Sequence, residues 1–280
     1  SGIDPNYKDE ILTRSGKLQP KYRDKINLIT QPYLNTEYLG FKMDDKDENN
    51  PLRDKRVRQA INYGFSREKM IKYMRNNIGY PGEFGIIPMG LAGFDSTSKA
   101  YNYNPEKSKQ LLAQAGYPNG EGMQEITLST TATYLDLCKY IQQQLGLLGI
   151  KVKIDVNPPA ALREHIAQGK TQWFRGSWIA DYADAENYLS LFYSKNHCPK
   201  GSNYTHFSSK EYDKLYEKAI LETDYEKRIA LYKKMNDIII EESPIVVLYY
   251  DQVLRFVQKN ISGFESNPLN LLILKNVNKD

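Results

Sequence analysis

The pattern of hydrophobic and polar positions is clearest at residues 104–120, NPEKSKQLLAQAGYPNG. Asn104 is a good N-cap, Pro105 suits the first helical position, and apolar residues recur on one side of the segment. Gly116 supplies the left-handed residue that commonly ends a helix. The segment therefore predicts a helix with defined ends.

The residues that follow alternate between the strand period and the helix period. Residues 125–132 predict a strand, residues 133–150 a helix with an apolar stripe, and residues 151–156 a strand with strict alternation. A strand, a helix and a second strand joined by short links indicate a parallel βαβ unit.

The second half of the chain continues this alternation. We expect a short helix over residues 161–169, a strand over residues 171–180 and a helix from about Ala185. Residues 244–257 form a long extended apolar run, and the tail at residues 267–277 predicts one more strand. The whole pattern is typical of an α/β domain with mixed sheets.

Two late helices carry matching start signals. Ser208 with Glu211, and Thr223 with Glu226, both fit the capping box, in which the first residue of each pair is the N-cap. Pro244 ends the second of these helices, because proline cannot continue the hydrogen-bond ladder.

Both ends of the chain look incomplete as parts of a sheet. Residues 1–35 contain short strand-like pieces, such as residues 24–30, without enough partners, and the last thirty residues have the same character. Unpaired strand edges are a liability for a folded protein. We expect both ends to belong to a second lobe whose greater part lies outside this sequence.

Composition fits an ordinary globular protein and excludes some classes. The chain has 280 residues, enough for one large domain or two modest ones, with 40% hydrophobic and 26% charged residues. The 38 basic and 34 acidic side chains leave a net charge of only +4 and are scattered, so no nucleic-acid partner is expected. No stretch approaches the roughly 20 apolar residues of a membrane helix.

Metal and redox chemistry are not indicated. Cys138 and Cys198 are far apart and form no CxxC motif, which leaves either two free thiols or a disulfide in an exported protein. The acidic run at residues 44–50 lacks the glycine and the distal glutamate of a calcium loop. We therefore expect no metal and no cofactor.

Four segments together resemble the peptide-binding proteins of ABC importers, the bacterial extracellular solute-binding proteins of family 5. Any one of them is a weak signal, but their order and spacing agree from about residue 36 to the end of the chain. The segments are PLRDKRVRQAINYGFSREKMI (51–71), YNYNPEKSKQLLAQAGYPNGEG (101–122), GSWIADYADAENYLSLFYS (176–194) and MNDIIIEESPIVVLYY (235–250).

The resemblance implies a fold of two lobes that close over a ligand. It implies that residues 36–250 form the C-terminal lobe, while residues 1–35 and 251–280 belong to the N-terminal lobe. The expected fold class is therefore an α/β lobe of the periplasmic-binding-protein type, class II, with mixed sheets and βαβ units. The chain corresponds to the C-terminal half of a family member.

The resemblance also implies a function without catalysis. Short peptides would be bound outside the cytoplasm and delivered to the membrane permease subunits of an ABC importer. The protein would act as an exported monomer in the periplasm or at the outer face of the cytoplasmic membrane, with or without a lipid anchor. The alternative keeps the fold and changes the ligand to a nickel complex, haem, a sugar or an opine.

Asp181 is the first candidate site residue because it places a carboxylate at the end of an apolar strand. A helix cap or a buried partner of an arginine would explain it without any ligand. The resemblance implies that Asp181 holds the α-ammonium group of the bound peptide. A charge-assisted hydrogen bond of this kind contributes roughly 1.5–3 kcal/mol.

Arg175 is the second candidate, six residues earlier and on the same face of the strand by alternation. In a straight strand its Cα would lie roughly 20 Å from that of Asp181, so Arg175 could receive the peptide carboxylate. A structural ion pair is the alternative.

Other members of this segment complete the predicted site. Trp173 and Trp178 lie on opposite faces by parity, and we place Trp178 in the cleft and the other tryptophan in the core. Ile179, Ala180 and Tyr182 are its remaining members, with Tyr182 next to the ligand's first residue.

An enzyme is the rival from another class. Asp181, Asp184 and Glu186 form a carboxylate cluster of the kind that glycoside hydrolysis uses. However, the chain shows no serine-nucleophile motif and no phosphate loop, and His165, His197 and His206 have no nucleophile spacing; the other two carboxylates also suit the first turn of the following helix. We therefore predict that the protein is not an enzyme.

Overall fold

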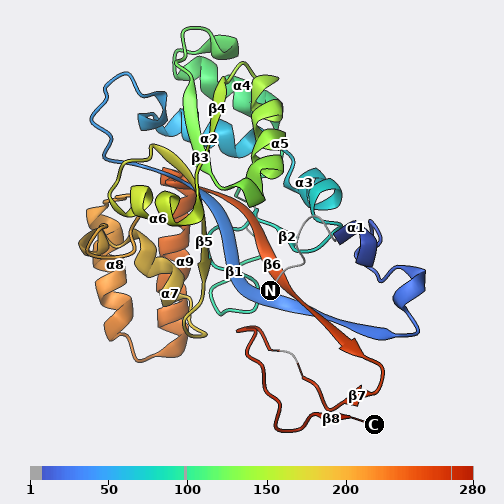
Figure 1. Cartoon of the computed structure of the whole chain (residues 1–280). Coiled ribbons are helices and arrows are strands. Elements are labelled where there is room, and N and C mark those ends of the chain that lie inside the picture. Colours follow the sequence, from blue (N-terminus) through green and yellow to red (C-terminus); the bar gives the residue numbers. More distant parts are fainter. Residues whose placement is uncertain (1–7, 98–99, 266, 280) are drawn as a thin grey trace.

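A mixed six-stranded sheet runs through the middle of the molecule (Figure 1). The computed structural model describes residues 8–97, 100–265 and 267–279. The sheet has the order β2-β6-β1-β5-β3-β4. Its strands are β1 (Ile26–Phe41), β2 (Tyr80–Pro81), β3 (Ile126–Thr130), β4 (Val152–Val156), β5 (Trp173–Ile179) and β6 (Ile245–Gln258).

The predicted βαβ unit is confirmed. β3 and β4 pair in parallel along their whole length, and α5 (Leu135–Gly146) connects them. β5 continues the sheet parallel to β3 and then pairs antiparallel with β1. The carboxyl ends of β3, β4 and β5 therefore point the same way, and ligands of open α/β sheets usually bind at that edge.

Helices cover both faces of the sheet. One face packs against α2 (Lys55–Tyr63), α3 (Arg67–Met74), α4 (Pro105–Gln114) and α5. The other face packs against α6 (Pro159–Ala167), α7 (Glu186–Leu189), α8 (Lys210–Leu221) and α9 (Tyr225–Glu242). Short 3-10 turns lie at Pro20–Tyr22, Pro51–Arg53, Pro118–Gly120, Ala132–Tyr134 (η4), Ser190–Phe192 and Ser194–Asn196.

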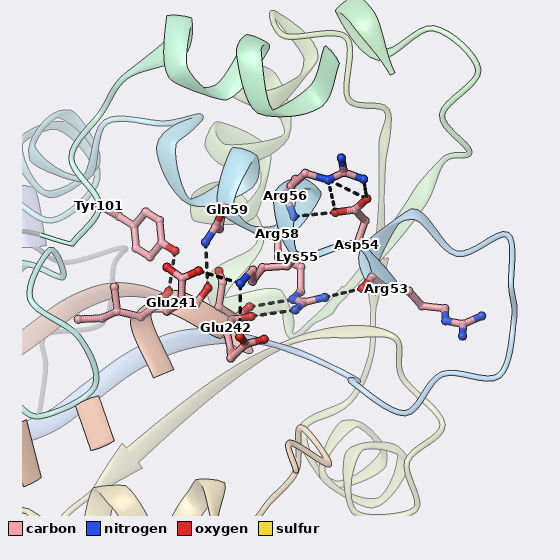
Figure 2. A network of polar contacts seen from close by, with 11 residues as sticks. Arg53, Asp54, Lys55, Arg56, Arg58, Gln59, Tyr101, Glu241 and Glu242 are labelled. Carbon is pink, nitrogen blue, oxygen red and sulfur yellow. Dashed lines mark hydrogen bonds and ion pairs between the residues drawn. The ribbon is translucent and has the colours of Figure 1, made fainter. Parts of the chain in front are cut away.

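The start of α2 meets the end of α9 in a dense polar network (Figure 2). Lys55 donates to Glu241 at 2.7 Å, and the buried Arg58 donates to backbone carbonyls that include that of Glu242. The network ties the helices of one face to the strand that follows α9.

β1 and β6 extend away from the helices as a two-stranded arm. The outer part of β1, residues 26–32, pairs with residues 252–258 of β6. Figure 1 shows this arm running toward the side of α1 (Lys8–Ile11), with β7 (Ile261–Ser262) and β8 (Asn278–Lys279) beyond the end of β6. The predicted lobe boundaries at residues 35/36 and 250/251 both fall inside these two long strands.

The signals of the 104–120 helix are confirmed. The side chain of Asn104 accepts a hydrogen bond from the Lys107 N–H at 2.9 Å, and Pro105 is the first helical residue. Gly116 has φ +93°, in the left-handed region.

The predicted caps of the two late helices are wrong by one residue. Ser209 caps α8 and Asp224 caps α9, in place of Ser208 and Thr223. In both helices the observed cap is itself a favoured N-cap residue, so the spacing to the glutamate pointed to the wrong neighbour.

The strand predicted over residues 267–277 is also wrong. These residues form turns and irregular structure, and four consecutive apolar side chains, Leu271 to Leu274, are exposed. In the described part of the chain β1 meets them through the Leu34 N–H, which donates to the Pro268 carbonyl at 3.0 Å, and no strand ladder forms, so apolar character alone does not make them a strand.

Candidate ligand-binding site

The second half of β5 has one free edge. β3 pairs with β5 only at Trp173 and Phe174, whereas β1 pairs with it as far as Ile179. On the side away from β1, no strand of the described chain pairs with the remainder of β5.

Hydrogen-bond alternation shows which backbone groups face this edge. The Ala180 N–H donates to the Leu34 carbonyl at 2.9 Å, so the backbone N–H and C=O groups of Ala180 face β1. Because successive residues of an antiparallel strand alternate, Trp178 also faces β1, while Ser177 and Ile179 turn their N–H and C=O groups away. These groups form an open ladder.

A cavity of about 540 Å³ lies beside this edge, at the carboxyl ends of the parallel strands. Its size is that of a small-molecule site, and its wall combines apolar rings with a few polar groups. The aromatic lining residues are Tyr38, Tyr134, Phe174, Trp178 and Tyr204; the hydroxyl and charged ones are Thr131, Thr133, Ser177, Arg163 and Arg175.

Asp181 lies beyond the cavity wall, at the α7 end of the free edge. Its side chain is exposed, and one carboxylate oxygen accepts from the Asn187 amide at 3.3 Å. The Asp181 N–H donates back to the Asn187 side-chain oxygen at 3.1 Å. The second carboxylate oxygen has no partner among the described residues, which leaves it available to a cation.

Asn187 is one of the site residues that sequence reasoning missed. It is 4% exposed, and its side-chain oxygen also accepts from the indole N–H of Trp178 at 2.8 Å. One buried amide thus fixes both the tryptophan ring and the loop that carries Asp181. No pattern in the sequence marks this role, because the contacts cross the turn between β5 and α7.

The helix-cap explanation of Asp181 is wrong. The residue at the N-cap of α7 is Ala185, and the Glu186 N–H is bonded to the side chain of Asp184 at 2.9 Å. Asp181 stands too far before the helix to cap it. No arginine of the described chain forms an ion pair with it either, so the second ligand-free explanation also lacks support.

Arg175 is engaged within the protein. Its guanidinium forms an ion pair with Glu37 and lies 3.4 Å from the ring centroid of Tyr134. The side chains of Arg175 and Glu37 are only 13% and 4% exposed. Burial lowers the pKa of Arg175, but the charges of Glu37, Tyr134 and Tyr249 outweigh it, so the pKa is raised overall.

The expected same-face relation of Arg175 and Asp181 assumed a strand that reaches Asp181. β5 ends at Ile179, and the chain bends before Asp181, so strand alternation no longer applies there. The structure therefore realises the ion-pair alternative for Arg175. Its role toward a ligand stays a prediction.

A polar network continues from this ion pair, with a neutral amide bridging two carboxylates. The Asn35 amide donates to Glu37 at 3.1 Å and to Asp251 at 3.3 Å. Arg75 in turn donates to Asp251 at 2.7 Å. The network links the middle of β1, β5 and β6 to one another and to the residue that follows α3.

The remaining predicted residues of the segment lie as follows. Trp173 is fully buried against α2–α5, and Trp178 is half-buried on the opposite face, as parity predicted. Ile179 and Tyr182 are each about half exposed, and Ala180 is buried. The Tyr182 hydroxyl donates to Glu186, so this ring is tied to α7.

Asp184 and Glu186 are already satisfied by neighbours. Glu186 accepts from the hydroxyls of Tyr182 and Tyr216, and Asp184 lies 3.7 Å from Arg228. Neither residue lines the cavity.

Two of the three histidines have structural contacts that the sequence did not indicate. The ring of His206 bonds to the Cys198 thiol at 2.9 Å and to Asp44 at 2.8 Å, in the order of a nucleophile, a base and an orienting acid. Burial raises the pKa of the Cys198 thiol, which is 5% exposed. A raised pKa disfavours the thiolate that nucleophilic attack would need. His197 stacks on the same ring.

Other classes of site were sought in the same part of the chain. Both cysteines are free thiols. Within residues 8–97, 100–265 and 267–279, no three His, Cys, Asp or Glu side chains gather as metal ligands. In those same ranges no helix combines the length and the apolar character needed to cross a membrane.

Sequence comparison gives one family and a set of curated relatives. Residues 7–199 match the family described as bacterial extracellular solute-binding proteins, family 5 Middle. The dipeptide-binding protein of Escherichia coli (strain K12) is 27% identical over 261 residues, which are 92% of this chain and 48% of that protein. The glutathione-binding protein GsiB of the same strain is 30% identical over 250 residues, 87% of this chain and 48% of that one.

Solved structures share the fold. The periplasmic binding protein DppA from Helicobacter pylori, in complex with the peptide STSA, matches with a TM-score of 0.82 and 27% identity, over all of this chain and 52% of that one. The oligopeptide-binding protein AppA from Bacillus subtilis matches with a TM-score of 0.80 over 55% of its length. The chain thus spans about half the length of the relatives it matches.

Proposed function

The chain belongs to family 5 of the bacterial extracellular solute-binding proteins, and we propose that it binds short peptides outside the cytoplasm. In this proposal residues 36–250 are one lobe, residues 1–35 and 251–280 belong to the other, and the protein acts as an exported, non-catalytic monomer. It delivers its peptide to the permease of an ABC importer. The names of the dipeptide-binding and glutathione-binding relatives support this class of ligand.

The observation that carries the proposal is a free strand edge that ends at an unpaired carboxylate. An extended peptide laid along Ser177 and Ile179 would continue the sheet and satisfy their outward N–H and C=O groups. This mode takes affinity from the main chain and therefore accepts many sequences. The aromatic cavity beside the edge would receive side chains.

Asp181 gives this peptide a direction. Its amino terminus is a cation, and the unpaired oxygen of Asp181 is the anion at the α7 end of the edge. Asn187 holds the carboxylate in place before the ligand arrives, which reduces the entropy lost on binding. The peptide then runs antiparallel to β5, toward α6.

Calorimetry on the full-length protein tests the proposal. We expect a pool of tri- to pentapeptides to bind, and N-acetylation of the peptides to weaken binding. Asp181→Asn keeps the shape and the Asn187 contact but removes the charge, so it should cost about 1.5–3 kcal/mol, roughly 10- to 150-fold in Kd.

Two results would contradict it. If the native protein ignores free peptides, the ligand class is wrong. If Asp181→Asn binds free peptides as tightly as the native protein does, Asp181 does not hold the ammonium group.

A second candidate keeps the fold and takes a non-peptide solute, such as a sugar, an opine, haem or a nickel complex. The cavity favours it in one respect, because its lining combines Tyr134, Trp178 and Tyr204 with the neutral hydroxyls of Thr131 and Thr133. Stacking aromatics with neutral polar partners suit a sugar. Thermal-shift screening separates the two candidates: a ligand that stabilises the native protein and Asp181→Asn equally favours the second.

A further inference from the structure

Two arginines line the cavity beside the β5 edge, and they differ in how far the protein already uses them. Arg175 is paired with Glu37 and stacked on Tyr134, in a largely buried position. A ligand carboxylate would have to share this buried guanidinium with Glu37, which already binds its Nη2. Displacing Glu37 would leave a buried charge without its cation, which is strongly unfavourable, so Arg175 is the less available of the two arginines.

Arg163 is in the opposite condition. It projects from α6, is exposed and lines the same cavity. Within the described ranges it has no hydrogen bond, ion pair or ring contact, so its whole guanidinium fork is available. A free arginine suits a carboxylate because the fork binds both oxygens at once.

In the described chain, the cavity wall contains no carboxylate that would compete with a ligand for Arg163. The lining residues include no aspartate and no glutamate. Pro159, the first residue of α6, also lines the cavity, and α6 has no side-chain cap. The N-terminus of α6 carries a partial positive charge, so it attracts an anion in the cavity just as the arginine does.

The fold places α6, which carries Arg163, and α7, which Asp181 precedes, beside opposite ends of β5. Figure 1 shows α6 beside the part of β5 that is near β3, and α7 beside the other end of β5. Asp181 precedes α7 directly. A peptide that anchors its amino group at Asp181 and runs antiparallel to β5 therefore brings its carboxyl end toward α6.

We propose that Arg163 binds the C-terminal carboxylate of the peptide and thereby selects short peptides with a free carboxyl end. The inference rests on the proposed function, and it replaces Arg175 by Arg163 as the carboxylate receiver. The free part of the edge, Ser177 to Ile179, is three residues long, about 7 Å between its outer Cα atoms, and so faces about three ligand residues.

The test compares trialanine with trialanine amide on the full-length protein by calorimetry. The native protein should prefer the free acid about tenfold or more, and Arg163→Gln should reduce this preference to about one. Arg163→Lys, which keeps the charge, should restore part of it. Lys153→Gln is the matched control: it removes one positive charge from an exposed position on β4 outside the cavity, and the preference should stay as in the native protein.

The outcomes separate the two proposals. If Arg163→Gln keeps the native preference for the acid, the inference is wrong while peptide binding stands. If Asp181→Asn lowers affinity for both trialanines but keeps their ratio, the two ends are read independently, as proposed. If the native protein binds neither compound nor any peptide of the pool, the proposed function fails, and the inference fails with it.

Discussion

Two buried arginines in this molecule show the difference between a structural centre and a ligand-binding region. Arg58, in the network between α2 and α9, has a backbone acceptor for each guanidinium nitrogen (Figure 2). Arg175, on β5, has one charged acceptor, Glu37, and a buried Nε without a partner. The first centre is complete within the chain, and the second borders on an open cavity.

The pKa directions of the two arginines reflect the same difference. Burial lowers the pKa of Arg58 to about 10, and the more distant charges of Glu242 and Asp54 offset this only in part. Arg175 is also buried, but its contact with Glu37 helps to raise its pKa. Neutral carbonyls thus hold Arg58 in place, whereas a buried anion fixes the charge of Arg175.

The comparison teaches where this chain places its binding potential. Networks that satisfy themselves, such as the one in Figure 2, stabilise the layers. Around β5 the fixed pair of Arg175 and Glu37 supports the sheet, while Asp181, Arg163 and the outward groups of Ser177 and Ile179 remain unsatisfied. Unsatisfied groups that share one edge indicate a ligand more strongly than any single residue does.

The largest effect is expected from Arg58→Met. It leaves the carbonyls of Leu52, Arg53, Glu242 and Ser243 without their donor. Unsatisfied buried acceptors cost about 1–3 kcal/mol each, so we expect unfolding free energy to fall by about 3–5 kcal/mol in urea titration, with the acid-to-amide preference unchanged. A loss below about 1 kcal/mol would show that this network is not a structural centre.

A smaller loss of stability is expected from Arg175→Gln. The variant leaves Glu37 buried without a cation, which should cost about 3 kcal/mol, although Asn35 still donates to it. The double variant Glu37→Gln/Arg175→Gln removes both charges and should recover more than half of the loss. Urea titration of the three proteins checks this.

An unchanged stability of Arg175→Gln would contradict the distinction drawn between the two arginines. If Arg175→Gln leaves stability within about 0.5 kcal/mol and abolishes the preference for free acids, Arg175 is a ligand residue after all.

The smallest effect is expected from Asn187→Ala, and it falls on binding. Without the amide, the Asp181 carboxylate and the Trp178 ring lose their common anchor. We expect about tenfold weaker binding of free peptides, close to 1.4 kcal/mol, by calorimetry. Tyr182→Phe, which removes only the hydroxyl bonded to Glu186, is the control and should bind nearly as the native protein does. Equal affinity of Asn187→Ala and the native protein would contradict the anchoring role.

Local signals in the sequence predicted much of the fold. The punctuation of α4 and the periods of β3, α5 and β4 involve residues that are close along the chain, so pattern reasoning found them. The caps at Ser209 and Asp224 were missed by one residue, because adjacent side chains compete for the same role. The tail at residues 267–277 was assigned to a strand from its apolar character, which cannot show whether a partner strand is present.

The site was predictable only in part, for the same physical reason. Asp181 stood out because a carboxylate after an apolar strand is unusual within one segment. Glu37, Tyr134 and Arg163 come from β1, η4 and α6, and nothing local indicates that they meet β5. The pairing of Arg175 with Glu37 and the availability of Arg163 are therefore properties of the tertiary structure.

The most direct test of the central claim, that a ligand completes the free edge of β5, is hydrogen exchange at single backbone amides of the full-length protein. The amides of Ser177 and Ile179 should exchange rapidly without ligand and slowly with saturating trialanine. Those of Trp178 and Ala180, which face β1, should be slow in both states. Bound trialanine that leaves Ser177 and Ile179 as exposed as before would contradict the claim, because the ligand would then lie elsewhere.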